Sequence, residues 1–228
     1  MVEIVTAQNR SLYEAELRDM FEMRYRVAKE LGWELPDAQD GLDIDQFDRD
    51  DTIHFLEFNN QRQVKACARL NPTTEPNLLS DIFPEFCELG GIPADPDVYE
   101  YSRYMVEKAG QTKADFIMAR ARITLAINEY CLENAISQVT VLTYMKNYPI
   151  ASLIWKTRPL GTPRMYAPDN AKYIAAISDM TDDGLANARA FARIKEPVAS
   201  FIVPMPLKFA GNSSLLSGQS NPLEAANA

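Results

Sequence analysis

The 228-residue chain contains one histidine and three cysteines, and this scarcity excludes several kinds of chemistry. His54 lies in an apolar run at residues 53–58, which is typical of a packed strand, so we do not expect a Ser-His-Asp or Cys-His mechanism. Cys67, Cys87 and Cys131 are far apart and fit no metal-ligand spacing. We therefore expect neither a disulfide nor a zinc site, and we predict that all three cysteines are packing residues in a reducing compartment.

Long apolar runs and excess positive charge are also absent from the sequence. No run approaches the roughly 20 apolar residues that span a bilayer, and Glu3 stands where a signal peptide would carry basic residues. We therefore predict a cytoplasmic protein that does not enter a membrane. The formal net charge of −9 argues against broad nucleic-acid binding.

The apolar fraction of 46% is sufficient for the core of one ordinary domain, which we place at residues 1–209. After Phe209 the chain turns to Gly, Ser, Asn and Gln, and we predict a disordered tail at residues 210–228. Local patterns predict strands at residues 2–6, 53–59, 63–70, 99–106, 138–143, 173–177 and 201–203. They predict helices at residues 12–30, 78–83, 114–134, 149–156 and 183–194. This mixture of hairpins and crossovers predicts an α/β fold with a mixed sheet that is covered on both faces.

The predicted strand at residues 99–106, Tyr-Glu-Tyr-Ser-Arg-Tyr-Met-Val, carries charges on both of its faces. Strict alternation of side chains would place Glu100 on one face and Arg103 on the other. Both charges can be structural or can face solvent. They can instead serve one reaction site if the strand bulges or splays, because bulges re-aim side chains next to active sites. We predict such an irregularity between Tyr99 and Tyr104.

Residues 33–51 form a strongly acidic segment with eight carboxylates and no helical or strand periodicity. A run of like charges is commonly a solvated loop. Trp33 and Phe47 do not fit that description, because a large aromatic side chain needs a core to enter or a ligand to cover. Since Asp45 and Asp48 flank Phe47, this loop can also close over a cationic substrate.

Six short motifs follow one another in the first half of the chain. They are Arg24, Leu-Gly-Trp at residues 31–33, Asp-Gln-Phe-Asp at 45–48, Arg-Leu-Asn-Pro-Thr at 69–73, Phe-Pro at 83–84 and Glu-Tyr-Ser-Arg at 100–103. In this order and at these separations they resemble the N-acyl-homoserine-lactone synthases, the autoinducer synthases of bacterial quorum sensing, over roughly residues 1–205. One departure is Ala28, which stands where that family usually places a phenylalanine. Either another aromatic such as Tyr25 fills the gap, or the end of the helix is remodelled.

The resemblance implies a three-layer αβα sandwich with a mixed, mostly antiparallel sheet, similar to the acetyltransferase-type N-acyltransferases. It implies an acyltransferase that moves an acyl group from an acyl thioester, carried on acyl carrier protein, to the amine of S-adenosylmethionine (SAM). The carboxylate of SAM then attacks its own γ-carbon, which closes a lactone and releases methylthioadenosine. SAM is a substrate in this reaction, and the resemblance implies no further cofactor and no metal.

The resemblance also assigns roles to individual residues. Glu100 is the candidate general base, and Ser102 and Arg103 are candidate catalytic residues where a bulge can free backbone N–H groups for the thioester oxyanion. The candidate substrate-binding residues are Arg24, Trp33, Asp45, Asp48, Arg69, Phe83, Tyr104 and Thr140. Arginines can hold carboxylates in a fork, whereas carboxylates and a tryptophan face suit the sulfonium and ammonium charges of SAM. Arg69 and Asp48 can alternatively be a purely structural ion pair.

The second half of the chain supplies the expected contacts to the acyl donor. Candidates for an apolar acyl slot are Met118, Leu125, Leu142, Met145, Leu153 and Trp155. An acidic acyl carrier protein would be repelled by a chain of net charge −9 unless positive charge gathers at the contact. Four cations stand in a stretch without nearby acids, and we predict them as the carrier docking patch: Lys146, Lys156, Arg158 and Arg164.

Three alternatives stay open at this point. The acyl donor can be a coenzyme A (CoA) thioester in place of a carrier-protein thioester. The chain can be an acetyltransferase-like N-acyltransferase of another amine, although such enzymes carry a glycine-rich pyrophosphate loop and residues 107–114 contain a single glycine. The third alternative is a small-molecule-binding domain without turnover, against which the presence of Glu100, Arg24 and Arg103 argues.

Overall fold

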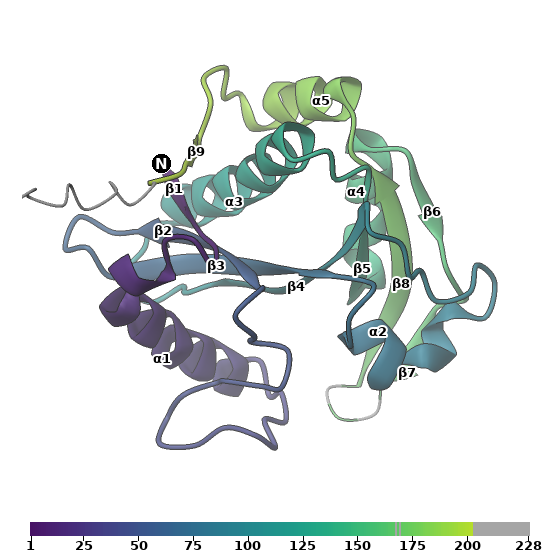
Figure 1. The fold of residues 1–228 in the computed structure, drawn as a ribbon, viewed down its shortest axis with the longest axis horizontal. Coiled ribbons are helices and arrows are strands. Elements are labelled where there is room, and N and C mark those ends of the chain that lie inside the picture. The colour runs from purple at the N-terminus through teal and green to yellow at the C-terminus, as the bar shows by residue number, and fades with distance from the viewer. Residues whose placement is uncertain (167, 169, 203–228) are drawn as a thin grey trace, which may run out of the picture.

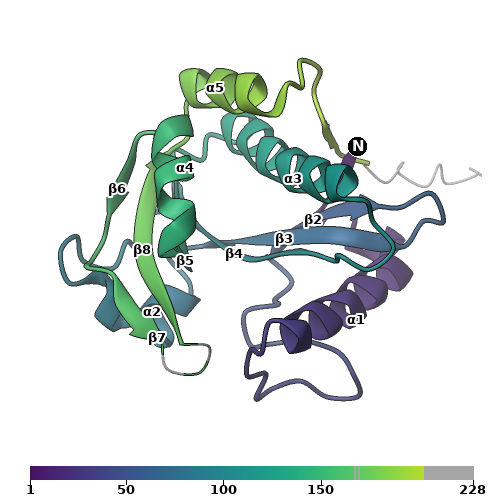
Figure 2. The ribbon, with the colours of Figure 1, turned by 180° about the vertical axis from the view of Figure 1, so that it is seen from behind.

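The computed structural model of the chain describes residues 1–166, 168 and 170–202. Figure 1 shows the fold, and Figure 2 shows the same ribbon from behind. The tail predicted at residues 210–228 and the end of the strand predicted at residues 201–203 lie outside the described residues. The extent of a single domain at residues 1–209 stays a prediction.

One mixed sheet runs through the described part of the chain. Its strands are β1 (Val2–Val5), β2 (Ile53–Phe58), β3 (Val64–Pro72), β4 (Val98–Val106), β5 (Gln138–Tyr144), β6 (Thr157–Pro159), β7 (Arg164–Tyr166), β8 (Ala171–Asp179) and β9 (Ala199–Ser200). Their order is β6-β8-β5-β4-β3-β2-β1-β9, and β7 also pairs with β8. The pairs β4–β5 and β1–β9 are parallel, and the other described pairs are antiparallel. The mixed, mostly antiparallel sheet is therefore confirmed.

Helices cover both faces of this sheet. They are α1 (Glu14–Glu30), α2 (Leu78–Asp81), α3 (Lys113–Glu133), α4 (Tyr148–Ile154) and α5 (Asp182–Ala192), with 3-10 turns η1 (Arg10–Leu12), η2 (Pro84–Cys87) and η3 (Met145–Asn147). Helix α1 packs on β3 and β4 from one side, whereas α3 packs on β1 to β4 from the other side and contacts α5 (Figures 1 and 2). This confirms the three-layer αβα arrangement.

Local sequence explains where the long helices begin. The side chain of Thr112 accepts a hydrogen bond from the backbone N–H of Asp115, so it caps α3, which contains neither glycine nor proline. Thr181 caps α5 in the same way through the N–H of Gly184. Helix α1 ends before Gly32, whose φ of +73° suits glycine.

Three differences from the predicted elements have a common cause in tertiary pairing. Strands β6 and β7 have three residues each and too little pattern to be predicted, and they exist because both pair with the longer β8. The last strand lies at Ala199–Ser200, earlier than predicted. It is held there because the Glu129 carboxylate accepts the backbone N–H groups of Val198 and Ala199 at 2.9 and 2.8 Å.

The residues expected to be internal are buried. Cys67, Cys87 and Cys131 are free and buried, and His54 is fully buried in β2, so both predictions are confirmed. Among the described helices, none is both long and apolar enough to cross a bilayer.

Strand β4 bulges where the sequence predicted an irregularity. In its pairing with β3, Cys67 lies opposite Met105, but Arg69 lies opposite Ser102, so β4 has one residue more than β3 between these two pairs. Arg103 has a φ of +50°, in the left-handed region that residues other than glycine seldom adopt. The predicted bulge is therefore confirmed, and its extra residue is Arg103 or its neighbour.

Strand β4 also separates from β5. Among the described residues, their parallel ladder ends at the pair Tyr101–Val141, although β4 continues to Val106 and β5 to Tyr144. Beyond that pair, the facing edges of the two strands do not hydrogen-bond to each other as a ladder. A ligand that enters between the strands therefore meets strand backbone on both sides.

Candidate active site

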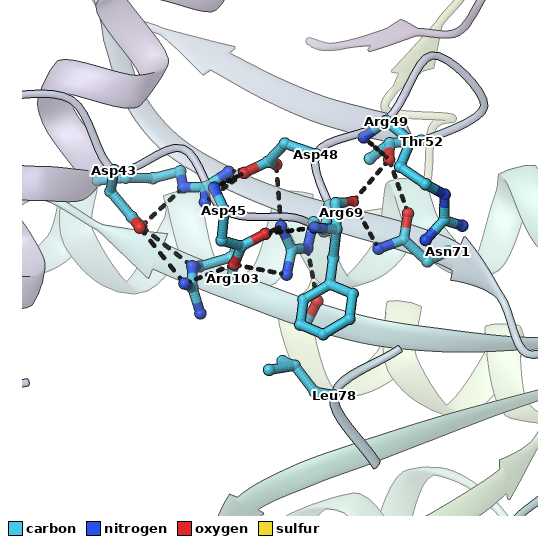
Figure 3. A network of polar contacts seen from close by, with 12 residues as sticks. Asp43, Asp45, Asp48, Arg49, Thr52, Arg69, Asn71, Leu78 and Arg103 are labelled. Atoms are coloured by element: carbon cyan, nitrogen blue, oxygen red, sulfur yellow. Dashed lines mark hydrogen bonds and ion pairs between the residues drawn. The ribbon is translucent and has the colours of Figure 1, made fainter. Parts of the chain in front are cut away.

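Three arginines and three aspartates form a closed ring of alternating charges (Figure 3). Arg24 comes from α1, Arg69 from β3 and Arg103 from the bulge of β4, and the acidic loop supplies the aspartates. Around the ring, the nitrogen–oxygen distances are 3.0 Å for Arg24–Asp43, 3.0 Å for Asp43–Arg103, 2.6 Å for Arg103–Asp45, 2.6 Å for Asp45–Arg69, 2.9 Å for Arg69–Asp48 and 2.8 Å for Asp48–Arg24. Each member therefore has two neighbours of opposite charge.

The ring is almost completely withdrawn from solvent. The side chains of Arg24, Arg69 and Asp48 are 0% exposed, whereas that of Arg103 is 16% exposed. Arg24 binds Asp48 through both terminal nitrogens, at 2.8 and 2.9 Å. Such two-point contacts fix the direction of a guanidinium as well as its charge.

Arg24 and Asp48 stay ionised because the opposite charges around them stabilise both groups. Burial alone would lower the pKa of Arg24, but Asp48 and Asp43 raise it above its ordinary value. Burial alone would raise the pKa of Asp48, but Arg24 and Arg69 hold it well below its usual range. Arg24 and Asp48 are therefore both charged at neutral pH.

The acidic loop is ordered by its own side chains, so it is more than a solvated connection. The Asp45 carboxylate accepts the N–H of Phe47, and the Asp48 carboxylate accepts the N–H of Asp45. Phe47 is 2% exposed, and its carbonyl accepts hydrogen bonds from Thr52 and Asn71 (Figure 3). Phe47 is therefore a core residue, which is one of the two explanations given above for an aromatic side chain in this loop.

Glu100 lies on the same side of the sheet as the ring. Its carboxylate is buried and accepts the backbone N–H groups of Leu78 and Leu79 at the start of α2, at 3.1 and 2.8 Å. Burial raises the pKa of Glu100, and the two N–H groups and the charge of Arg69 oppose this only in part. A carboxylate with a raised pKa is a stronger base than an exposed glutamate.

Ser102 and Thr140 complete this face. The Ser102 hydroxyl accepts a hydrogen bond from Nε of Arg69 at 2.9 Å, so it is attached to the ring. Thr140 lies directly beside Glu100 in the parallel pairing of β4 and β5. Thr140 is 1% exposed, and within the described residues its hydroxyl has no hydrogen-bond partner.

Trp33 links the acidic loop to the end of β5. Its indole N–H donates to the Tyr144 hydroxyl at 3.1 Å, at the end of β5. The Tyr144 ring lies 4.5 Å from that of Tyr173, and Phe83 packs against Tyr166 at 5.7 Å. The side chains of Trp33, Tyr144 and Tyr173 therefore follow one another from the acidic loop through β5 to β8.

Ala28, where the chain departs from the family pattern, lies close to Trp33 at the end of α1. Ala28 is fully buried in the core cluster under α1, and Trp33 packs against the same cluster. The Trp33 backbone N–H donates to the Ala28 carbonyl at 2.9 Å. Tyr25 does not belong to this cluster, so Tyr25 does not fill the space beside Ala28, and a remodelled helix end stays a prediction.

Comparison with known proteins identifies the family. Residues 8–181 match the family model described as autoinducer synthase. The chain belongs to the autoinducer synthase family. It is 32% identical over 184 residues, 79% of this chain and 80% of the relative, to the isovaleryl-homoserine lactone synthase of Bradyrhizobium diazoefficiens. The resemblance drawn from the six motifs is confirmed, and this chain is an acyl-homoserine-lactone synthase and thus an acyltransferase.

Solved structures agree with this assignment. A CoA-dependent acyl-homoserine lactone synthase, BjaI, solved with SAM and isopentyl-CoA, has a TM-score of 0.80 and 29% identity and covers 90% of this chain and 95% of its own. FeeM, an N-acyl amino acid synthase from uncultured soil microbes, has a TM-score of 0.56 and 13% identity and covers 80% of this chain and 97% of its own. The second likeness shows a shared N-acyltransferase fold only.

The ring assembles most of the synthase residues that the motifs singled out. Its members Arg24, Asp45, Asp48, Arg69 and Arg103 were all expected to bind substrate or take part in catalysis. Direct contact with a substrate stays a prediction for each of them. Arg103, at 16% exposed, can make such a contact directly, whereas the fully buried members, like Glu100, need a small rearrangement or a water relay to do so.

Asp43 is a ring member that the sequence reading did not single out. Its carboxylate accepts from Nε of both Arg24 and Arg103 at 3.0 Å. Eight acids crowd residues 33–51, and spacing alone does not separate Asp43 from its neighbours. The fold selects it because the N–H of Asp43 donates to the Phe21 carbonyl in α1, which sets the loop beside Arg24.

Tyr104 is not brought together with the ring. The bulge turns it to the opposite face, where it packs with Tyr101 against the core cluster that includes α3 residues. Its hydroxyl donates to the carbonyl of Arg120 at 3.0 Å, and the Arg120 guanidinium lies 5.6 Å from the centre of its ring. Substrate contact by Tyr104 stays a prediction, and any such contact would occur on the α3 side.

The fold brings acids to three of the four cations in the predicted docking patch, and the patch itself stays a prediction. Lys156 and Arg158 both approach the Asp179 carboxylate, at 3.8 and 3.3 Å, and Arg164 approaches Glu88 at 3.3 Å. These acids are distant in sequence from the cations. Asp179 ends β8 and Glu88 follows η2, and the fold brings both to this edge of the sheet. The patch therefore has less free positive charge than the stretch alone indicated.

Proposed function

We propose that this synthase acylates the α-amine of SAM with an acyl group from a CoA thioester and then closes the homoserine lactone. Two observations favour CoA over the expected acyl carrier protein. BjaI, which is 29% identical, was solved with SAM and isopentyl-CoA. In addition, Lys156, Arg158 and Arg164 already have acidic partners, which weakens their attraction for an acidic carrier.

The observation that carries the proposal is the bulge of β4, next to the place where β4 leaves β5. It directs Arg103 to the side of Glu100 and Ser102, so a base, a hydroxyl and a guanidinium converge beside unpaired backbone. A thioester that lies between the strands has its carbonyl carbon close to these groups. Acyl transfer needs this combination of a base and oxyanion donors.

In the first step, Glu100 takes a proton from the SAM ammonium group, and the free amine attacks the thioester carbonyl. An α-amine has a pKa near 8, so it needs a base at neutral pH. Each oxygen of Glu100 accepts one N–H and retains capacity for another hydrogen bond. The N–C bond forms, and backbone N–H groups at the bulge stabilise the oxyanion. The nitrogen then loses its second proton and the C–S bond breaks, so the amide forms and the CoA thiolate leaves and takes up that proton.

In the second step, a carboxylate oxygen of the acylated SAM attacks its γ-carbon. The new C–O bond closes the ring, and the bond from the γ-carbon to sulfur breaks, so methylthioadenosine leaves as a neutral molecule. The exposed part of Arg103 can hold the carboxylate in the attacking direction. Because the attack is intramolecular, the protein contributes mainly by fixing the folded conformation of the substrate.

Mass spectrometry of the products tests the proposal. The synthase is incubated with SAM and, in parallel, with acyl-CoA and acyl-carrier-protein thioesters of matched chain length. We expect methylthioadenosine and acyl-homoserine lactone in equal amounts, at higher kcat/KM with the CoA thioesters. Preference for the carrier protein would refute the CoA donor, and acylation of another amine without methylthioadenosine would refute SAM as the acceptor.

A further inference from the structure

The hydroxyl of Tyr101 is buried without a partner. No hydrogen-bond partner for this oxygen exists in the part of the chain that the structure describes, and the oxygen itself is shielded from solvent. Buried polar atoms are nearly always paired, and an unpaired one destabilises the folded protein. Phenylalanine would fill the same space without that cost. An orphan hydroxyl at this position therefore indicates that something outside the chain completes its hydrogen bond.

The position of Tyr101 points to the acyl donor. Tyr101 forms the last described pair of the parallel ladder with Val141, so its side chain stands where β4 and β5 begin to separate. The side chain packs on the α3 side with Tyr104, their ring centres 5.6 Å apart. Tyr104 differs in one respect, because its hydroxyl already donates to the Arg120 carbonyl. Of these two tyrosine hydroxyls, that of Tyr101 has no partner among the described residues and can bind a ligand.

The Tyr101 hydroxyl does not hydrogen-bond to the reacting carbonyl of the thioester. Glu100 and Ser102 face the side of the ring, whereas Tyr101 faces α3, so the sheet separates the hydroxyl from the groups that attack the thioester. A chain that enters between the strands with its thioester at the bulge has its later carbons on the Tyr101 side. Apolar neighbours suit the hydrocarbon, and the hydroxyl suits one oxygen within it.

Building on the function proposed above, we propose that Tyr101 is a specificity-determining residue that hydrogen-bonds an oxygen substituent, a ketone or a hydroxyl, on the acyl chain of the donor. Burial keeps the pKa of Tyr101 well above its ordinary value, so the phenol stays protonated and can donate. Thr140 also has an orphan hydroxyl, but it shares the face of Glu100 and lies nearer the reacting carbonyl.

The test compares three CoA thioesters of equal chain length: one with a 3-oxo group, one with a 3-hydroxyl and one without a substituent. Tyr101→Phe should lower kcat/KM for the oxygenated donors by about 10-fold or more, since one hydrogen bond is lost. For the unsubstituted donor, kcat/KM should be unchanged or higher. The midpoint of thermal unfolding should not fall, because the variant breaks no hydrogen bond within the protein. Tyr99→Phe is the matched control, with a ring on the same face but two residues before the end of the β4–β5 ladder.

Three results would overturn the proposal. An equal loss for all three donors would place the hydroxyl at a part of the thioester that they share. A lower unfolding midpoint would show that the hydroxyl is bonded within the protein. Selectivity lost in Thr140→Val but kept in Tyr101→Phe would assign the recognition to Thr140. If wild-type synthase accepts only carrier-protein thioesters, the CoA donor fails, and the same comparison on carrier-protein thioesters decides the role of Tyr101 independently.

Discussion

Replacing Asp48 with asparagine removes one negative charge from the buried ring and keeps the size of the side chain. Asp48 binds Arg24 at 2.8 and 2.9 Å and Arg69 at 2.9 Å, and its side chain is 0% exposed. In Asp48→Asn these two guanidinium groups lose their common counter-charge and stay buried. Breaking a buried ion pair by removing one partner typically costs about 3–5 kcal/mol. That is a large part of the roughly 5–15 kcal/mol that stabilises an ordinary domain.

Urea unfolding measures this loss directly, and thermal unfolding should show it as a fall of roughly 10 °C for a chain of this size. Asp50→Asn is the matched control, since Asp50 is an exposed carboxylate two residues along the same loop and forms no described ion pair. It should change the unfolding free energy by less than about 0.5 kcal/mol. If Asp48→Asn is as stable as the control, the ring does not hold the loop, and the argument for its positioning role is wrong.

The pH dependence of the unfolding free energy of Asp48→Asn is a second test. The pKa of Asp48 is lowered in the folded protein from an ordinary value of 3.8, so its stabilisation is fully present above that value and is lost as the pH falls below it. Wild type and Asp48→Asn should therefore differ by a constant amount at neutral and mildly acidic pH. Their unfolding free energies should converge only in stronger acid.

Three further predictions concern single sites. Glu100→Gln should lower kcat by about 100- to 10,000-fold in a lactone assay and leave SAM binding in calorimetry nearly unchanged, and an unaltered kcat would show that another group takes the proton. Burial lowers the pKa of His54 from 6.5 to about 3, so stability is lost as pH falls below 6.5; between pH 6.5 and 5 the loss should be about 2 kcal/mol, absent in His54→Phe. Reversing Lys156 and Arg158 to Glu should leave the KM for acyl-CoA unchanged in steady-state kinetics, whereas a steep rise at low salt would restore them as donor contacts.

Much of the fold was predictable because local patterns and tertiary packing agree. Helix α3 has a capping threonine and an uninterrupted run of helix-forming residues, and β4 has the aromatic and β-branched composition of a strand. The bulge was predictable for a chemical reason, since Glu100 and Arg103 could share one site only if alternation failed. Strands β6 and β7 were not predictable, because their three-residue runs form strands only by pairing with β8.

Partners of charged residues were the least predictable feature of the site. Arg69 and Asp45 are 24 residues apart in sequence and Arg103 and Asp43 are 60 apart, so no spacing rule relates them. The same is true of Asp179, which pairs with Arg158 across β6 and β8 and offsets part of the positive charge at that edge. Which acid meets which base depends on strand register, and register is fixed by the whole sheet.

The ring and the bulge are best understood together. Arg103 has a φ of +50°, and for a residue with a side chain that conformation costs on the order of 1–2 kcal/mol. The same residue makes a two-point contact with Asp43, at 3.0 and 3.3 Å, and an ion pair with Asp45 at 2.6 Å. These contacts are possible only when the bulge turns the guanidinium to this face, so the ring stabilises the strained backbone at Arg103. We therefore expect the buried acids of the ring to act on the site by holding β4 in its irregular form.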